Sequence, residues 1–123
     1  MLKAVLRMMR PGTLKKRADF LRAARARRAP VTAFLVQARQ RSDSEDADPD
    51  AIRVGFTCSK KVGNAVARNR AKRRLREVAR AILPLEGRAG WDYVLIGKAG
   101  DTATHPMEAM KADLSRALRK LHK

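Results

Sequence analysis

Nine Lys or Arg residues lie within the segment SKKVGNAVARNRAKRRLREVAR, residues 59–80, where Glu77 is the single acid. On a helix, positions three and four apart are neighbours, so like charges at that spacing destabilise the helix unless an outside anion compensates them. Arg68, Arg70 and Lys72 also oppose the positive end of the helix macrodipole. The segment therefore predicts an anion-binding surface rather than an ordinary solvated face.

A helical wheel at about 100° per residue divides this segment into two faces. The apolar face holds Ala67, Ala71, Leu75, Val78, Ala79 and Ile82. The other face carries a polar stripe about 16 Å long, formed by Asn69, Arg73, Arg76 and Arg80. Arginine suits such a stripe because its planar guanidinium can bind a phosphate or a base edge with two donors. The amide of Asn69 can read a ribose or a base edge, or it can cap the helix; both interpretations stay open.

Residues that could catalyse a reaction are few. The two histidines, His105 and His122, lie near the end of the chain, and no periodicity pairs either of them with a nucleophile. Cys58 is the single cysteine, which excludes an intrachain disulfide and a Cys-based zinc site. We predict no catalytic residue and no metal ligand in the protein.

Composition favours a nucleic-acid partner. The 123 residues suffice for one domain, and 29 Lys plus Arg against 12 Asp plus Glu give a net charge of +17. Five of the acids lie in SDSEDADPD, residues 42–50, so the rest of the chain carries 29 minus 7, or +22. No apolar run is long enough for a signal peptide or a membrane span. We therefore expect a soluble cytoplasmic protein with no membrane partner.

The apolar periodicity predicts six elements in one domain over residues 14–123. They are a helix over 14–28 that Pro30 stops, strands over 31–40 and 52–59, the basic helix ending at Pro84, a strand over 91–97, and a last helix that Thr104 caps, with Pro106 in its first turn. This order predicts an α+β sandwich with helices laid on a small sheet. Residues 1–13 predict a basic flexible arm, and the acidic segment 42–50 a solvated loop.

The block KKVGNAVARNRAKRRLRE, with RVGFTCSKK directly before it and RADF some 40 residues upstream, resembles the protein subunit of bacterial ribonuclease P. The resemblance spans residues 14–121. It implies a ribosomal-protein-S5-domain-2-like, two-layer α+β sandwich with a left-handed crossover through the basic helix, where the general rule would give a right-handed one. It also implies an endoribonuclease that removes the 5′ leader of precursor tRNA. In that ribonucleoprotein the RNA is the catalyst and uses Mg²⁺, and one protein binds each RNA.

The resemblance also assigns residues to two surfaces. The basic helix and the turn before it would contact the catalytic RNA through Lys60, Lys61, Arg68, Asn69, Arg70, Lys72, Arg73 and Arg76, with Arg80 added by the stripe. A cleft between the first helix and the sheet would receive the single-stranded leader, with Phe20 as a stacking platform, Phe34 as a possible contributor and Gln37 as a further cleft residue. Ala24 and Gln37 stand where many members have further aromatics, so we expect leader binding to depend more on charge and to be steeper in salt.

Other interpretations stay open. Phe20 and Phe34 can be core residues. The charge also fits a structural RNA-binding protein of ribosomal type, which would not stimulate cleavage of precursor tRNA. A helix-turn-helix DNA binder would need a second short helix beside its recognition helix, where residues 54–58 predict a strand.

Overall fold

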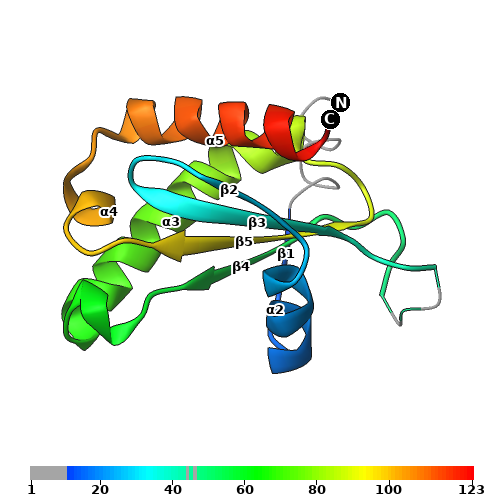
Figure 1. Ribbon diagram of the computed structural model, residues 1–123, viewed down its shortest axis with the longest axis horizontal. Helices are drawn as coiled ribbons and strands as arrows, with labels where there is room; N and C mark the ends of the chain where they lie inside the picture. The colour runs from blue at the N-terminus through cyan, green and yellow to red at the C-terminus, as the bar shows by residue number, and fades with distance from the viewer. Residues whose placement is uncertain (1–10, 44, 46) are drawn as a thin grey trace.

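The strand Trp91–Gly97, β5, lies in the middle of the sheet because its side chains are buried on both faces. The computed structural model describes residues 11–43, 45 and 47–123. The sheet has the strand order β1-β4-β5-β3-β2, with β4 and β1 parallel to β5 and β3 antiparallel to it (Figure 1). The elements are β1 (Gly12–Thr13), α2 (Arg17–Ala24), β2 (Arg27–Pro30), β3 (Phe34–Gln40), β4 (Arg53–Thr57), η1 (Lys60–Val62), α3 (Ala65–Glu86), β5, α4 (Asp101–Thr104) and α5 (Met107–Leu121).

Helices α3 and α5 cover one face of the sheet and α2 covers part of the other. The larger core lies under α3 and α5, where Phe34, Leu75 and Tyr93 are fully buried. A smaller cluster, Leu14, Ala23 and Val94, lies under α2. The sheet with α3 and α5 is the predicted two-layer α+β sandwich, and α2 adds a partial layer behind it.

The turn before α3 explains why the basic helix begins where it does. Asn64 is the N-cap, and its side chain accepts a hydrogen bond from the backbone N–H of Ala67 at 2.9 Å. Gly63 has φ +139°, and a Cβ there would lie 2.8 Å from the Cβ of Ala67, so this turn requires glycine. The chain passes from β4 through α3 to its parallel neighbour β5. This is the position of the crossover that the resemblance implied.

The first predicted helix is too long. It ends at Ala24 rather than Arg28, and Arg27–Pro30 forms the edge strand β2, paired with β3. Ala29 is buried beneath α5, while the Arg27 guanidinium donates to the carbonyls of Leu121, at 2.8 Å, and Lys123, at 3.3 Å. These contacts are distant in sequence, so the local pattern could not indicate them.

Other boundaries also differ from the prediction: α2 begins at Arg17 rather than residue 14, β3 begins at Phe34 rather than residue 31, and β4 spans Arg53–Thr57 rather than residues 52–59. Pro84 lies inside the last turn of α3, which continues to Glu86, and Pro106 is the N-cap of α5 rather than a residue of its first turn. The Thr104 hydroxyl donates to the carbonyl of Gly100 within α4, so Thr104 does not cap α5. Most of the predicted arm, residues 1–10, lies outside the described residues, and Gly12–Thr13 is a strand.

Candidate nucleic-acid interface

The basic helix α3 has the two faces that the wheel predicts. Ala71, Leu75, Val78 and Ala79 are buried, and Ala67 and Ile82 are half-buried. The polar stripe of Asn69, Arg73, Arg76 and Arg80 is exposed along its length. Since Asn64 caps the helix, Asn69 does not, and its amide is available to a ligand.

The other predicted cations lie around the beginning of α3. Lys60 and Lys61 are exposed in η1, which Ser59 caps by accepting from the N–H of Lys61. Arg70 is exposed and Arg68 and Lys72 are half-buried. Burial raises the pKa of the Cys58 thiol, although the charges of Lys72 and Arg68 oppose that rise. The structure thus brings all the predicted RNA-contact cations onto α3 and the turn before it.

Arg74 belongs to the fold rather than to this surface. Its guanidinium donates to the carbonyl of Thr102 at 2.8 Å and to the carbonyl of His105, and it contacts the Met110 sulfur at 3.5 Å. It therefore anchors the α4–α5 connection onto α3, whereas its neighbour Arg73 extends into solvent.

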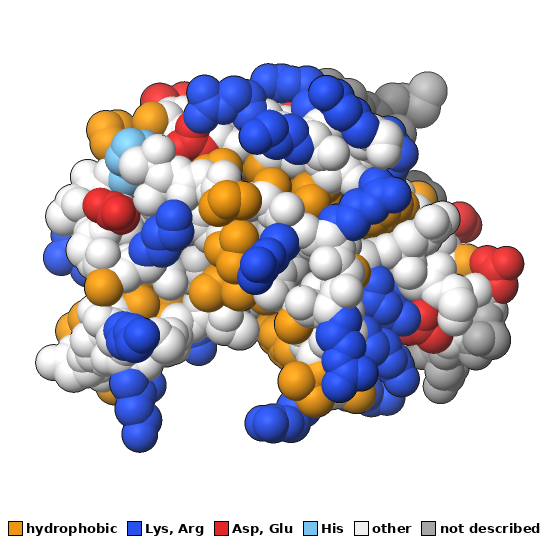
Figure 2. All heavy atoms as spheres, viewed as in Figure 1, with side chains coloured by type: hydrophobic (Ala, Val, Ile, Leu, Met, Phe, Trp, Pro, Cys, Tyr) orange, Lys and Arg blue, Asp and Glu red, His pale blue; other side chains and the backbone are white. Residues whose placement is uncertain are grey.

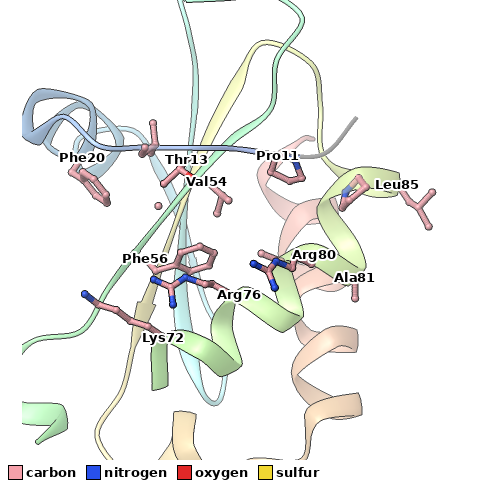
Figure 3. Close-up of a pocket in the computed structure, with 14 residues that line it drawn as sticks. Pro11, Thr13, Phe20, Val54, Phe56, Lys72, Arg76, Arg80, Ala81 and Leu85 are labelled. Carbon is pink, nitrogen blue, oxygen red and sulfur yellow. The ribbon is translucent and has the colours of Figure 1, made fainter. Parts of the chain in front are cut away.

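A groove of about 970 Å³ lies beside α3, between this helix and the β1–β4 edge of the sheet, with Phe20 of α2 among its walls (Figure 3). Lys72, Arg76 and Arg80 line it from α3, and no acidic side chain is among the described residues that line it. The remaining walls are largely apolar: Pro11, Leu14, Val54, Phe56, Pro84 and Leu85 among others. The groove combines cations with apolar surface, which is the combination that unpaired nucleotides require. Hereafter it is called the α3 groove.

Phe56 is a groove residue that the sequence pattern did not indicate. The Arg76 guanidinium carbon lies 5.7 Å from the centre of the Phe56 ring, within the range of a cation–π contact. Alternation along β4 assigns Phe56 to the core, together with Val54, and the ring does pack against the main core. It is only partly buried, however, so one side of it faces the groove. Nothing local in the sequence distinguishes this position from a fully buried one.

Phe20 also lines the groove, and its ring lies against Gly55 of β4. Phe34 does not line it: its side chain is 0% exposed and lies in the main core under α3 and α5, on the face of the sheet away from Phe20. Phe34 is a core residue, and a buried ring cannot stack on an incoming base. The structure thus brings Phe20 and Phe56 together with the cations and leaves Phe34 out.

Gln37 lies on the α2 face of the sheet but does not line the groove. Strand pairing places Gly55, Val94 and Gln37 in one row across β4, β5 and β3. α2 contacts this part of the sheet, and Gln37 is 8% exposed. The next row, Thr57, Ile96 and Leu35, is half-buried. Figure 2 shows a hollow between η1 and α2, with hydrophobic side chains inside it and Lys and Arg side chains on both rims.

The two histidines have structural contacts. Nε2 of His122 lies 2.7 Å from the Tyr93 hydroxyl, and burial, with the charges of Arg88 and Arg27, lowers the pKa of His122 to about 4. His122 is thus not the ordinary surface residue that its position near the end of the chain suggests. Nε2 of His105 lies 3.6 Å from the Asp113 carboxylate. Neither histidine lines the α3 groove.

Two features are absent from the described residues, a cluster of metal-binding side chains and a membrane-spanning helix. No group of three or more His, Cys, Asp or Glu side chains lies close enough together there to hold a metal ion. No helix within the described ranges is long and apolar enough to cross a membrane.

Comparisons with known proteins agree on one family. The family model described as Ribonuclease P matches residues 8–122. The "Ribonuclease P protein component" of Ruegeria pomeroyi is 65% identical over 109 residues, which cover 89% of this chain and 85% of that protein. The protein of the same name from Paramagnetospirillum magneticum is 46% identical over 108 residues, covering 88% and 80%.

Solved structures agree as well. The RNase P protein of Staphylococcus aureus superposes with a TM-score of 0.67 at 27% identity, covering 88% of this chain and 93% of that one. The RNase P protein of Thermotoga maritima gives a TM-score of 0.64 at 25% identity, covering 89% and 94%.

Proposed function

The chain belongs to the ribonuclease P protein family, and from that premise we propose that α3 and the α3 groove are the surfaces through which it binds RNA. As a member of the family it is a subunit of ribonuclease P, the ribonucleoprotein endoribonuclease that matures the 5′ ends of tRNAs. Its partner is ribonuclease P RNA.

Catalytic RNA contacts the exposed side of α3 and the turn before it. Arg68, Asn69, Arg70 and Arg73 form the centre of this contact, with Lys60 and Lys61 in the turn and Lys72, Arg76 and Arg80 toward the groove. Glu77 is the only acid within residues 59–80, so RNA phosphates are the natural counterions of these cations. Asn69 contributes an amide that can bind a ribose or a base edge.

The single-stranded 5′ leader of precursor tRNA occupies the α3 groove. The half-buried row of Thr57, Ile96 and Leu35, on the α2 face of the sheet, extends this surface. One observation carries the assignment: two partly exposed rings, Phe20 and Phe56, and three cations line one groove with no described acid. Stacking on aromatic rings tolerates any base sequence and contributes about 1–3 kcal/mol per base. Ala24 and Gln37 add no aromatic surface, so the leader interaction depends strongly on charge and falls steeply with salt.

The protein itself performs no bond-making chemistry. One protein binds each catalytic RNA in the cytoplasm, and the RNA supplies the Mg²⁺ sites and the catalysis. The protein contributes affinity, because it neutralises phosphates of the catalytic RNA and holds the leader of the substrate.

The test is cleavage of a precursor tRNA by ribonuclease P RNA at low millimolar magnesium, with the wild-type protein and with Arg68→Ala/Arg70→Ala. We expect the wild type to stimulate cleavage and the double variant to lose that stimulation. Arg119→Ala/Lys120→Ala is the matched control, because it removes two exposed cations from α5 instead. If the wild type binds RNA without stimulating cleavage, a structural role of ribosomal type is the better description.

A further inference from the structure

A cluster of acids and arginines ties α2 and the acidic loop to the sheet on the face opposite the main core. Asp92 is its centre, fully buried, with its carboxylate 2.7 Å from Arg41 and Arg53 and 3.4 Å from Arg39. The remaining members are Asp19 and Arg22 of α2 and Glu45 of the acidic loop. We call these seven residues the ionic cluster. It joins three segments that are far apart in the sequence.

Glu45 is the member that the acidic loop contributes. Its carboxylate pairs with Arg39, lies 3.6 Å from Arg22, and accepts a hydrogen bond of 2.7 Å from the backbone N–H of Ser42. The side chain is 16% exposed, so this part of the loop is not freely solvated as the sequence suggested. Burial alone would raise the pKa of Glu45, but Ser42 and Arg39 lower it to about 2. The Glu45 carboxylate is therefore ionised at the near-neutral pH at which the protein would bind folded RNA.

Helix α2 has few other means of holding its position. It has eight residues, its N-cap Lys16 makes no side-chain capping bond, and Ala23 is its one buried apolar residue. Arg22 is shared between two acids, since its guanidinium lies 3.4 Å from Asp19 and 3.6 Å from Glu45. Asp19 also lies 3.6 Å from Arg53 of β4. The Asp19–Arg22 pair lies within the helix, so the pairs with Glu45 and Arg53 are the two that join the Phe20 turn of α2 to the acidic loop and the sheet.

We infer that Glu45 is a positioning residue: through Arg22 and Arg39, the acidic loop holds α2 against the sheet and keeps Phe20 over Gly55 in the α3 groove. The inference rests on the proposed binding of the leader in that groove. It gives the acidic loop a role in substrate binding although none of its described residues lines the groove. Contacts of the catalytic RNA with α3 do not depend on the ionic cluster.

The experiment compares two precursor tRNAs bound to the reconstituted ribonucleoprotein, one with an extended leader and one with the leader cut to a single nucleotide. The dissociation constant of the substrate with the single-nucleotide leader, divided by that of the substrate with the extended leader, is the leader-dependent affinity. Glu45→Gln should lower this ratio by about three- to fivefold, the effect expected for a partly exposed ion pair. Affinity of the protein for the catalytic RNA should stay within about twofold.

Two further variants make the test specific. Asp43→Asn is the matched control, because it removes one charge from an exposed position of the same loop and should leave the ratio unchanged. Arg22→Gln breaks the pair from the α2 side and should reproduce the effect of Glu45→Gln. The double variant Arg22→Gln/Glu45→Gln should lose little more than either single variant, because all three break the same contact.

The outcomes separate the two proposals. If the wild-type protein adds no leader-dependent affinity, the proposed leader groove itself is wrong. The second outcome is that the wild type adds leader-dependent affinity and that Glu45→Gln and Arg22→Gln retain as much of it as Asp43→Asn does. The leader groove then stands and the positioning role of Glu45 is overturned. A parallel loss of catalytic-RNA affinity and thermal stability in both variants would also overturn it, since Glu45 would then stabilise the fold as a whole.

Discussion

The ring of Phe20 lies directly on the backbone of Gly55, with no space for a side chain between them. A Cβ at position 55 would lie 2.5 Å from both Cε1 and Cζ of the ring, closer than real Cβ contacts come. The Phe20 ring can therefore lie against β4 only because this strand has a glycine at that point. The same contact sets the position of the one aromatic ring that α2 contributes to the α3 groove.

Gly55→Ala should push the Phe20 ring away from β4. Overpacking of this kind costs about 1–3 kcal/mol in free energy of unfolding, and here part of that cost will appear as weaker leader binding because the half-buried ring can move. Urea denaturation and leader-dependent affinity measure the two effects. Gly12→Ala is the control, since a Cβ there would meet its nearest atom at 3.7 Å, an ordinary contact. If Gly55→Ala and Gly12→Ala have the same free energy of unfolding and the same leader-dependent affinity, the Phe20 ring accommodates the added methyl group without cost.

The adjacent residues Arg73 and Arg74 should respond to alanine in opposite ways. Arg73→Ala removes an exposed cation, so affinity for the catalytic RNA should fall and the slope of log affinity against log salt should decrease by about one. Arg74→Ala removes donors from the carbonyls of Thr102 and His105, so the free energy of unfolding should fall by about 1–3 kcal/mol with the salt slope unchanged. Salt titrations of RNA binding and urea denaturation distinguish them. A changed slope for Arg74→Ala would place that side chain on the RNA instead.

Much of this arrangement follows from local pattern, and the exceptions have physical reasons. The two faces of α3 and the bounds of β5 were predictable because their periodicity is strong and depends on no distant partner. The β2 strand was not, since Arg27 and Arg28 give no apolar alternation and their pairing with β3 appears only in the fold. Both faces of β3 are apolar, so the sequence could not decide that Phe34 lies under α3 and α5 while Gln37 lies on the α2 side.

Asp92→Asn should be strongly destabilising. The carboxylate is fully buried between Arg41 and Arg53, and Arg53 binds both of its oxygens, at 2.8 and 2.7 Å. Removing one partner of a buried ion pair leaves an uncompensated charge and costs about 3–5 kcal/mol. Urea denaturation measures the loss, and Asp50→Asn, at an exposed acid of the loop, should change the free energy of unfolding by less than about 0.5 kcal/mol. A similar small change for Asp92→Asn would mean that an amide satisfies the arginines equally well.

His122 should make the protein less stable in mild acid. Burial and the neighbouring arginines lower its pKa from 6.5 to about 4, so between these values the unfolded chain binds a proton that the folded protein does not. The free energy of unfolding therefore falls as the pH falls from about 6.5 to about 4. The slope over this interval corresponds to the uptake of at most about one proton by His122 on unfolding. His122→Gln keeps a group that can hydrogen-bond the Tyr93 hydroxyl but cannot titrate, so the stability of this variant should depend less on pH over this interval. Denaturation curves at several pH values test this, and identical slopes for the two proteins would contradict it.

The edge strand β2 has a consequence for the free protein. An exposed strand edge offers unpaired backbone groups to any other extended chain, and charged side chains and proline are the usual protection against such pairing. β2 is four residues long, carries Arg27 and Arg28, and ends at Pro30, while the opposite edge is covered by β1, which has two residues. Two molecules brought edge to edge at β2 would face each other with like charges. The positive charge that favours RNA binding thus also disfavours edge-to-edge pairing of the sheets of two protein molecules when RNA is absent.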